Sequence, residues 1–264
     1  MAGVRLTGGA LWYFGCLTAV LGACLGSFLN CAAWRMARGE SFLRGRSRCP
    51  VCGHVLGPAE LVPVLSWLLL RGKCRHCGAA ISPRYMLTEL ISAALALLCL
   101  LRFGLGVLFL RNLAFLCCLL CLSLVDWEIS EIPDGCLLFS AAVWAAAAPF
   151  SCSGWREAGL RIAAGLGFAL ALLLLSLAMD RALKKDSLGG GDIKLFAVVG
   201  LYLGFAGTLL ALILACVLGL LLAAALRRGA GEPFPFGPAI AAAAGIVLLW
   251  GDGPVAWYLG LLAP

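Results

Sequence analysis

The sequence predicts an all-α polytopic membrane protein with about eight transmembrane helices and a small zinc-knuckle insert on the cytoplasmic side. The first observation is composition: 63% of the 264 residues are hydrophobic and only 12% are charged, whereas soluble domains carry about 25% charged residues. The second is that the apolar residues form runs about as long as a bilayer-spanning helix. The third is that Lys and Arg gather in the segments on one side of these runs.

Each apolar run is interpreted as a helix that crosses the bilayer, which takes about 20 residues. No convincing cleavage site follows the first run, so we expect a retained first helix and not a cleavable signal. The region 193–226 is interpreted as two segments, with one helix plus a re-entrant piece as the alternative. The predicted spans are residues 10–33, 86–101, 105–125, 134–150, 158–179, 193–205, 207–226 and 237–251.

Charge distribution predicts the orientation. Alternation of the spans puts four connecting segments on one side, and these hold fifteen of the 20 Lys and Arg residues: nine in 34–85, four in 180–194 and two in 227–236. Segments rich in Lys and Arg face the cytoplasm, so we expect this side to be cytoplasmic. Membrane topology and contact with lipid headgroups explain the basic charge. Basic residues interleaved with aromatic residues would indicate nucleic acid binding, and the sequence shows no such pattern.

The chain is expected to have three parts: a first transmembrane helix (1–33), a cytoplasmic four-cysteine insert (34–85) and a multi-helix membrane peptidase domain (86–264). The insert contains two C-x-x-C pairs, and their spacing predicts a structural zinc site with four thiolate ligands. Such a site would stabilise a segment too small to build its own core. The predicted ligands are Cys49, Cys52, Cys74 and Cys77.

The alternative for these cysteines is thiol redox chemistry or a disulfide. A cytoplasmic location disfavours disulfides because that compartment keeps thiols reduced, and a thioredoxin-type pair would need a βαβ context. His54 and His76 lie beside the pairs, but four cysteines already fill a tetrahedral shell. We therefore expect both histidines to be bystanders or to support the ligands.

Two acidic clusters stand at the ends of apolar runs. Asp126 closes one run, and Pro133 and Asp134 suit the first turn of the helix that follows. Asp192 follows three glycines and opens another run. An ionisable residue at such a position is costly and is usually functional. The simpler interpretation of the cluster at Asp192 is a flexible linker that leads into a helix. The first turn of a helix favours an acidic residue.

Taken together, the two clusters predict an aspartic peptidase. Two carboxyl groups about 3 Å apart cannot both ionise, so one holds a proton while the other activates water. Peptide hydrolysis needs a base for the water and an acid for the leaving amine. No Ser/His/Asp set competes, and four thiolates leave a zinc ion no open position for catalysis.

The chain resembles the bacterial prepilin peptidases, which belong to the type IV prepilin leader peptidase and N-methyltransferase family of G-x-G-D intramembrane aspartyl proteases. The resemblance covers nearly the whole length. The motifs that carry it are Gly26-Ser27-Phe28-Leu29-Asn30, the paired C-x-x-C insert, Pro63-Val64-Leu65-Ser66-Trp67, Ile81-Ser82-Pro83-Arg84-Tyr85, Asp126 to Asp134, Gly189-Gly190-Gly191-Asp192-Ile193-Lys194, and Pro235-Phe236-Gly237-Pro238.

The resemblance implies that the protein cleaves a short basic leader from prepilin or pseudopilin precursors at the cytoplasmic face of the bacterial inner membrane. It assigns the catalytic pair to Asp126 and Asp192 and the zinc ion to the four cysteines. Many members also N-methylate the new N-terminus with S-adenosylmethionine, an activity associated with the cysteine-bearing insert. One departure is Glu128, where many members have aspartate.

Three other functions stay open. A presenilin-like or signal-peptide-peptidase-like protease shares G-x-G-D, but such proteins generally pair it with Tyr-Asp, and Val125 precedes Asp126 here. A proton-coupled transporter would use intramembrane carboxylates, although transport sites lie nearer the bilayer midplane. A structural membrane component of a secretion system would bind zinc but would catalyse no reaction.

Overall fold

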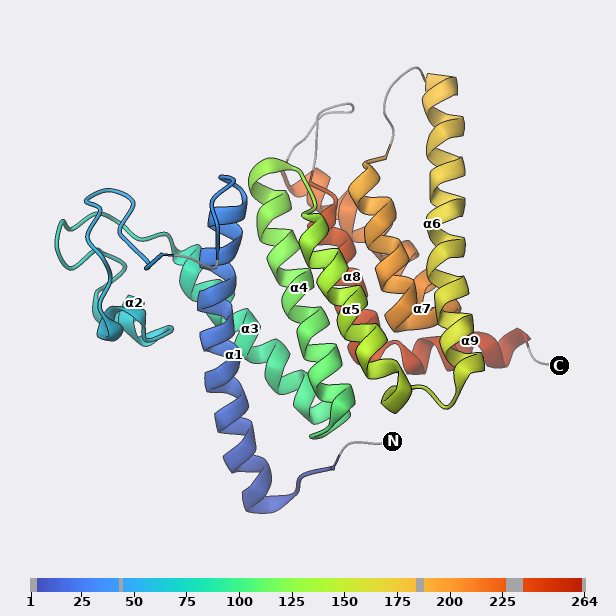
Figure 1. Ribbon diagram of the computed structural model, residues 1–264, viewed down its shortest axis with the longest axis horizontal. Helices are drawn as coiled ribbons and strands as arrows, with labels where there is room; N and C mark the ends of the chain where they lie inside the picture. Colours follow the sequence, from blue (N-terminus) through green and yellow to red (C-terminus); the bar gives the residue numbers. More distant parts are fainter. Residues whose placement is uncertain (1–3, 43–44, 184–187, 227–234, 263–264) are drawn as a thin grey trace. The chain divides into compact units, whose positions relative to one another are not determined.

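The computed structural model describes residues 4–42, 45–183, 188–226 and 235–262. The chain forms two compact units, Ala2–Leu113 and Ala114–Pro264, here called the N-terminal and C-terminal units. Helices build both units, and the extended pairings among the described residues are isolated bridges (Figure 1). The all-α class predicted from the sequence is therefore confirmed.

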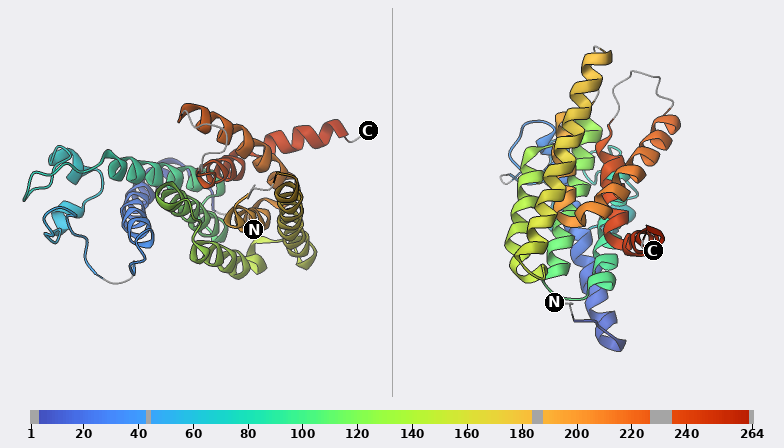
Figure 2. Two further views of the ribbon diagram at one scale, coloured as in Figure 1. Left: turned by 90° about the horizontal axis from the view of Figure 1, so that it is seen from above. Right: turned by 90° about the vertical axis from the view of Figure 1, so that its right-hand side faces the viewer.

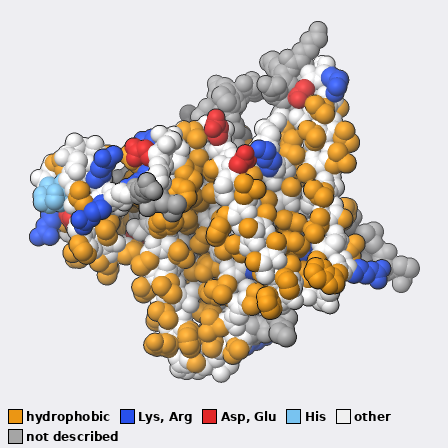
Figure 3. All heavy atoms as spheres, viewed as in Figure 1, with side chains coloured by type: hydrophobic (Ala, Val, Ile, Leu, Met, Phe, Trp, Pro, Cys, Tyr) orange, Lys and Arg blue, Asp and Glu red, His pale blue; other side chains and the backbone are white. Residues whose placement is uncertain are grey.

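The N-terminal unit consists of two long helices and the insert between them. Its elements are α1 (Gly8–Met36), the 3-10 helix η1 (Pro58–Leu61), α2 (Leu65–Leu69), α3 (Pro83–Phe103) and the beginning of α4 (Val107–Ile129). The insert extends sideways from the ends of α1 and α3 (Figure 2). Apolar side chains cover the exposed helix faces, whereas Lys, Arg and His side chains gather over the insert (Figure 3).

Small residues let α1 and α3 pack closely. A Cβ atom on Gly22 would lie 2.8 Å from Cβ of Ala96, and one on Gly26 would lie 2.8 Å from Cβ of Ser92. Glycine and alanine are typical of helix contacts within membranes, because they let the two backbones approach. This contact holds the ends of both helices, from which the insert emerges, in a fixed relation.

The C-terminal unit is a bundle in which α7 packs against α5, α6 and α8. Besides the rest of α4, its helices are α5 (Asp134–Ser151), α6 (Trp155–Leu183), α7 (Gly190–Ala225), α8 (Gly237–Trp250) and α9 (Asp252–Leu262). Within the described residues, six helices of the chain are long and apolar enough to cross a membrane, namely α1 and α3 to α7, while α8 is a shorter apolar helix.

The eight predicted apolar segments all fall on helices, and α9 is an additional helix that was not predicted. The predicted division of 193–226 corresponds to a break in α7 at Gly204, where φ is +66°. A positive φ is accessible to glycine at little steric cost. The region is thus two helical pieces joined end to end.

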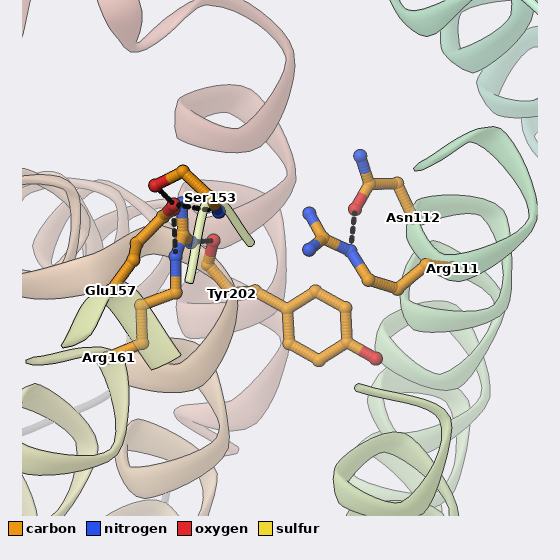
Figure 4. Close-up of polar contacts among 6 residues, drawn as sticks. All are labelled: Arg111, Asn112, Ser153, Glu157, Arg161 and Tyr202. Carbon is orange, nitrogen blue, oxygen red and sulfur yellow. Dashed lines mark hydrogen bonds and ion pairs between the residues drawn. The ribbon is translucent and has the colours of Figure 1, made fainter. Parts of the chain in front are cut away.

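A polar network supports this break. Arg161 Nη1 donates a 2.6 Å hydrogen bond to the carbonyl of Tyr202, two residues before Gly204. Glu157 holds Arg161 in place with a 3.0 Å bond from Arg161 Nε, and it also accepts from the N–H and the hydroxyl of Ser153 at 2.8 Å (Figure 4). The carbonyl at the break is therefore satisfied by a side chain of α6. In the same figure, Arg111 Nε donates to Asn112 Oδ1 within the N-terminal unit.

Replacement of Arg161 by alanine should lower the thermal stability of the protein in detergent. The change leaves the Tyr202 carbonyl without this donor, and an unsatisfied buried polar group costs about 1–3 kcal/mol. Arg156→Ala is the matched control, because Arg156 lies on the same helix with its side chain exposed. Equal melting temperatures for the two variants would contradict the assigned role of Arg161.

Candidate active site

Asp126 is held at the end of α4 by a contact with the start of α8. It is 5% exposed, and its Oδ2 accepts a 2.9 Å hydrogen bond from the backbone N–H of Gly237. A Cβ atom at position 237 would lie 2.8 Å from that oxygen. Glycine is therefore the residue that allows the backbone to come close enough to donate.

Helix α4 ends three residues after Asp126, at Ile129. Ser130 has φ +53°, and its N–H donates to the carbonyl of Asp126 at 2.8 Å. A left-handed residue after the last turn is a common way to end a helix. The residues that follow lead into α5, which begins at Asp134.

Asp192 lies in the first turn of α7, and its N–H donates to the carbonyl of Gly189 at 3.1 Å. The preceding glycine, Gly191, packs against Ile132, since a Cβ atom on it would lie 2.9 Å from Cβ of Ile132. Gly191 thus has a packing role between the two acidic motifs.

Asp126 and Asp192 line one cavity of about 320 Å³ in the C-terminal unit. The two acids, 66 positions apart in the chain, therefore contribute to the same cavity. The remaining lining residues are Ser130, Glu131, Ile132, Asp134, Gly189, Gly190, Gly191 and Lys194.

An ion pair joins the two motifs at the rim of this cavity. Lys194 Nζ lies 2.8 Å from Asp134 Oδ1 and 3.1 Å from Oδ2. Both side chains are well exposed, so the pair adds little stability by itself. It does give Lys194, in the motif of Asp192, a partner in the motif of Asp126.

The four cysteines come together in the N-terminal unit, with their Sγ atoms all within 4.8 Å of one another. The Sγ atoms of Cys49 and Cys77 are 3.9 Å apart, and a tetrahedral zinc site with Zn–S bonds of about 2.3 Å places its sulfurs about 3.8 Å apart. Cys49 and Cys74 are buried, whereas Cys52 and Cys77 are exposed. This geometry fits a metal ion with four thiolate ligands.

The two halves of the cluster repeat one local structure. The N–H of Cys49 donates to the carbonyl of His54, and the N–H of Cys74 donates to that of Ala79. Gly53 and Gly78 close the two turns with φ values of +71° and +70°. Each C-x-x-C pair therefore lies on a short hairpin that requires glycine at the same place.

The electrostatics of the cluster also favour a cation. Backbone N–H groups of Cys52 and Val51 lower the pKa of the Cys49 thiol to about 7. The N–H of Ala79 lowers the pKa of Cys77, but partial desolvation and the neighbouring thiols outweigh it and raise that pKa to about 11. A thiolate at Cys49 thus opposes a second thiolate at Cys77, because the two negative charges repel each other. A divalent cation at the centre would offset this repulsion.

The two histidines lie next to each other and near a carboxylate that the sequence did not single out. The ring centroids of His54 and His76 are 3.4 Å apart with the ring planes tilted by 34°, and His54 Nε2 is 3.9 Å from Glu60 Oε2. Neither histidine belongs to the four-cysteine group. Glu60 and Gly237 lie near the predicted sites, but the sequence alone assigns neither a role. Gly237 contacts Asp126, which is 111 positions away in the chain, and no sequence pattern links Glu60 to His54.

Comparison with known proteins agrees with this arrangement. Residues 20–103 match the Bacterial Peptidase A24 N-terminal domain, and residues 113–224 match the Type IV leader peptidase family. The two matched regions largely coincide with the two units. No solved structure matches the chain.

The chain is also similar to curated proteins named prepilin leader peptidase/N-methyltransferase. The protein of Bacillus subtilis (strain 168) is 36% identical over 91% of this chain and 96% of its own length. Those of Myxococcus xanthus (strain DK1622) and Aeromonas salmonicida (strain A449) are 35% and 34% identical, over 84% and 82% of this chain and 67% and 75% of their own lengths. Nothing in these matches favours a presenilin-like protease or a transporter. The chain is a membrane peptidase that belongs to the type IV leader peptidase family.

Proposed function

We propose that this peptidase removes the short basic leader of type IV prepilins or pseudopilins, the substrate class that the names of its relatives indicate. We assign the catalytic pair to Asp126 and Asp192. The observation that carries the assignment is that these two acids, from the end of α4 and the start of α7, line the same cavity. In the proposed topology this cavity opens at the cytoplasmic face of the bacterial inner membrane, because the basic segments predict that side.

The proposed reaction needs one carboxylate and one carboxylic acid. The carboxylate takes a proton from water, and the water oxygen adds to the carbonyl carbon of the scissile peptide. The carboxylic acid then gives its proton to the leaving nitrogen as the carbon–nitrogen bond breaks. The hydrogen bond from Gly237 fixes the orientation of Asp126 for its part in this exchange. Glu131, which also lines the cavity, supplies negative charge for a basic leader.

Asp126→Asn and Asp192→Asn should each reduce leader release by on the order of a thousandfold or more, because neither half of the reaction proceeds without its acid group. The measurement is cleavage of a purified prepilin by purified protein in detergent. Asp252→Asn, which changes an exposed acid outside the cavity, should cleave normally. Substantial cleavage by either active-site variant, with its melting temperature unchanged, would refute the assignment.

Gly237→Ala should lower the cleavage rate by about a hundredfold, the usual effect of displacing a catalytic group by an ångström. The added methyl group would lie 2.8 Å from Oδ2 of Asp126 and would displace that carboxyl group. Gly245→Ala on the same helix is the control, since its methyl group would make an ordinary 3.5 Å contact with Leu116. If both alanine variants cleave alike, Gly237 does not position Asp126.

We further propose that Cys49, Cys52, Cys74 and Cys77 bind a structural zinc ion. The fit of the sulfur positions to a tetrahedral shell supports this choice. A bound zinc ion would hold the two hairpins of the insert together and, with four thiolates, would take no part in hydrolysis. Thiol redox chemistry remains the competing proposal.

Cys49→Ser/Cys74→Ser protein should lose about one equivalent of bound zinc, because two of four ligands are removed. Elemental analysis of the purified protein gives the metal content. Cys16→Ser/Cys216→Ser changes two exposed cysteines outside the cluster and should retain its zinc. Stoichiometric zinc in the Cys49→Ser/Cys74→Ser protein would rule out the ligand set. A Cys49–Cys77 disulfide in wild-type protein that contains no metal would favour the redox alternative.

Finally, we propose that the chain also N-methylates the new N-terminus with S-adenosylmethionine. The names of the relatives support this second activity. Residues 20–103 match a domain model of their own, the Bacterial Peptidase A24 N-terminal domain, which supports a separate part of the chain for this activity.

A further inference from the structure

The insert contains a second group of side chains that could hold a metal ion, outside the four cysteines. His54, Glu60 and His76 each offer one ligand atom, and these atoms all lie within 4.8 Å of one another. The two histidines are the only ones in the chain. Among the described residues, neither ring forms a hydrogen bond with a cysteine sulfur. The three side chains therefore form a set of their own.

Glu60 is the member of this set that most needs a cation. Its side chain is only 10% exposed, and its Oε2 accepts a 2.8 Å hydrogen bond from the backbone N–H of Gly57. His54 Nε2 lies 3.9 Å from the same oxygen, which is beyond the usual range of a hydrogen bond. A buried carboxylate is costly unless it is paired with a cation or binds a metal. The neutral N–H donor meets this need only in part.

Local backbone structure presents all three side chains. The carbonyl of His54 accepts a 2.9 Å hydrogen bond from the N–H of Cys49 in the first hairpin, and His76 lies inside the second C-x-x-C pair. Glu60 lies in η1, where its N–H donates to the carbonyl of Gly57 at 3.0 Å. Carboxylates that bind metals are commonly oriented by a hydrogen bond such as the one from Gly57. Both hairpins and η1 thus contribute one ligand each.

We propose that His54, Glu60 and His76 bind a second divalent transition-metal ion, separate from the ion of the four cysteines. Two imidazoles and one carboxylate are a donor set that suits zinc and related ions such as cobalt and nickel. Three protein ligands leave a fourth position for water. The ion offsets the charge of the buried carboxylate and joins η1 to both hairpins. Glu60 also lines the cavity of about 350 Å³ that the insert forms with α1 and α3.

Binding of the ion requires a small movement of the two rings. Their centroids are 3.4 Å apart, with the planes tilted by 34°. Two imidazoles bound to one zinc ion through Zn–N bonds of about 2.1 Å have centroids about 4.5–5 Å apart, so the rings must separate by about 1 Å or more. His76 is exposed, and rotation about its side-chain bonds supplies this separation.

The test is a cobalt(II) titration of full-length protein in detergent, without a histidine tag and with its zinc retained. The wild-type protein should bind one additional equivalent of cobalt, without the sulfur-to-cobalt charge-transfer absorption that thiolate ligands produce. His54→Ala, Glu60→Gln and His76→Ala should each weaken this binding at least tenfold, since even residues that only orient metal ligands contribute about 10- to 100-fold. Arg75→Ala, which changes an exposed neighbour, should bind cobalt normally.

The two histidines provide an independent readout, because protein labelled with isotope-enriched histidine contains only two imidazole rings. Zinc added beyond the content of the cysteine site should shift the ring-nitrogen resonances of both histidines at the same zinc concentration. Glu60→Gln keeps an oxygen that can accept from Gly57 but removes the charge. In this variant the shift should need at least about tenfold more zinc.

The site is overturned if the wild-type protein binds no additional cobalt, or if the bound cobalt shows only thiolate absorption. Loss of the cysteine-bound zinc from His54→Ala or His76→Ala would show that the histidines support that ion instead. A zinc response of His54 alone would reduce the group to a pair with Glu60 and would also refute the proposal. Retained zinc shows that the insert of a variant is folded. Protein that binds cobalt at the histidines but no metal at the cysteines refutes the four-cysteine proposal alone.

Discussion

The positions of the two acids in the C-terminal unit depend on two glycines that let one segment approach another. Gly191 brings the start of α7 against Ile132, in the loop that follows Asp126, and Gly237 brings the start of α8 against Asp126 itself. At each place a single additional carbon would lie within 3 Å of a neighbouring atom. The segments that carry the two acids are therefore held by backbone proximity, with little contribution from the exposed Lys194–Asp134 pair.

Features that depend on nearby residues could be predicted from the sequence. Apolar runs gave the helices, and the C-x-x-C spacing gave the four-cysteine cluster, because each pair closes within one hairpin. The shared location of Asp126 and Asp192 could also be predicted, since one acid closes its apolar run, the other opens its run, and alternation of the spans puts both on one side. The donor to Asp126 could not, because Gly237 lies 111 positions away and the motif that contains it does not reveal its partner. The burial of Glu89 could not be predicted either, because its partner, Val64, belongs to a segment with a strained turn that composition does not show.

The N-terminal unit combines two kinds of wall around its cavity. One wall is α1 and α3, fixed by contacts between small residues, and the other is an insert built on two short hairpins that carry the four cysteines. Cys49 and Cys74 line the cavity themselves. The arrangement of the four cysteines thus helps to set the shape of the neighbouring cavity.

The break at Gly204 has a mechanical consequence for the helix that carries Asp192. A continuous helix transmits bending along its whole length, but α7 is interrupted at a glycine whose neighbouring carbonyl is secured to α6 by Arg161. The direction of the piece before the break is therefore independent of the direction of the piece after it. The placement of Asp192 is set within a short helical piece and its own contacts, and the longer remainder of α7 does not have to share its alignment.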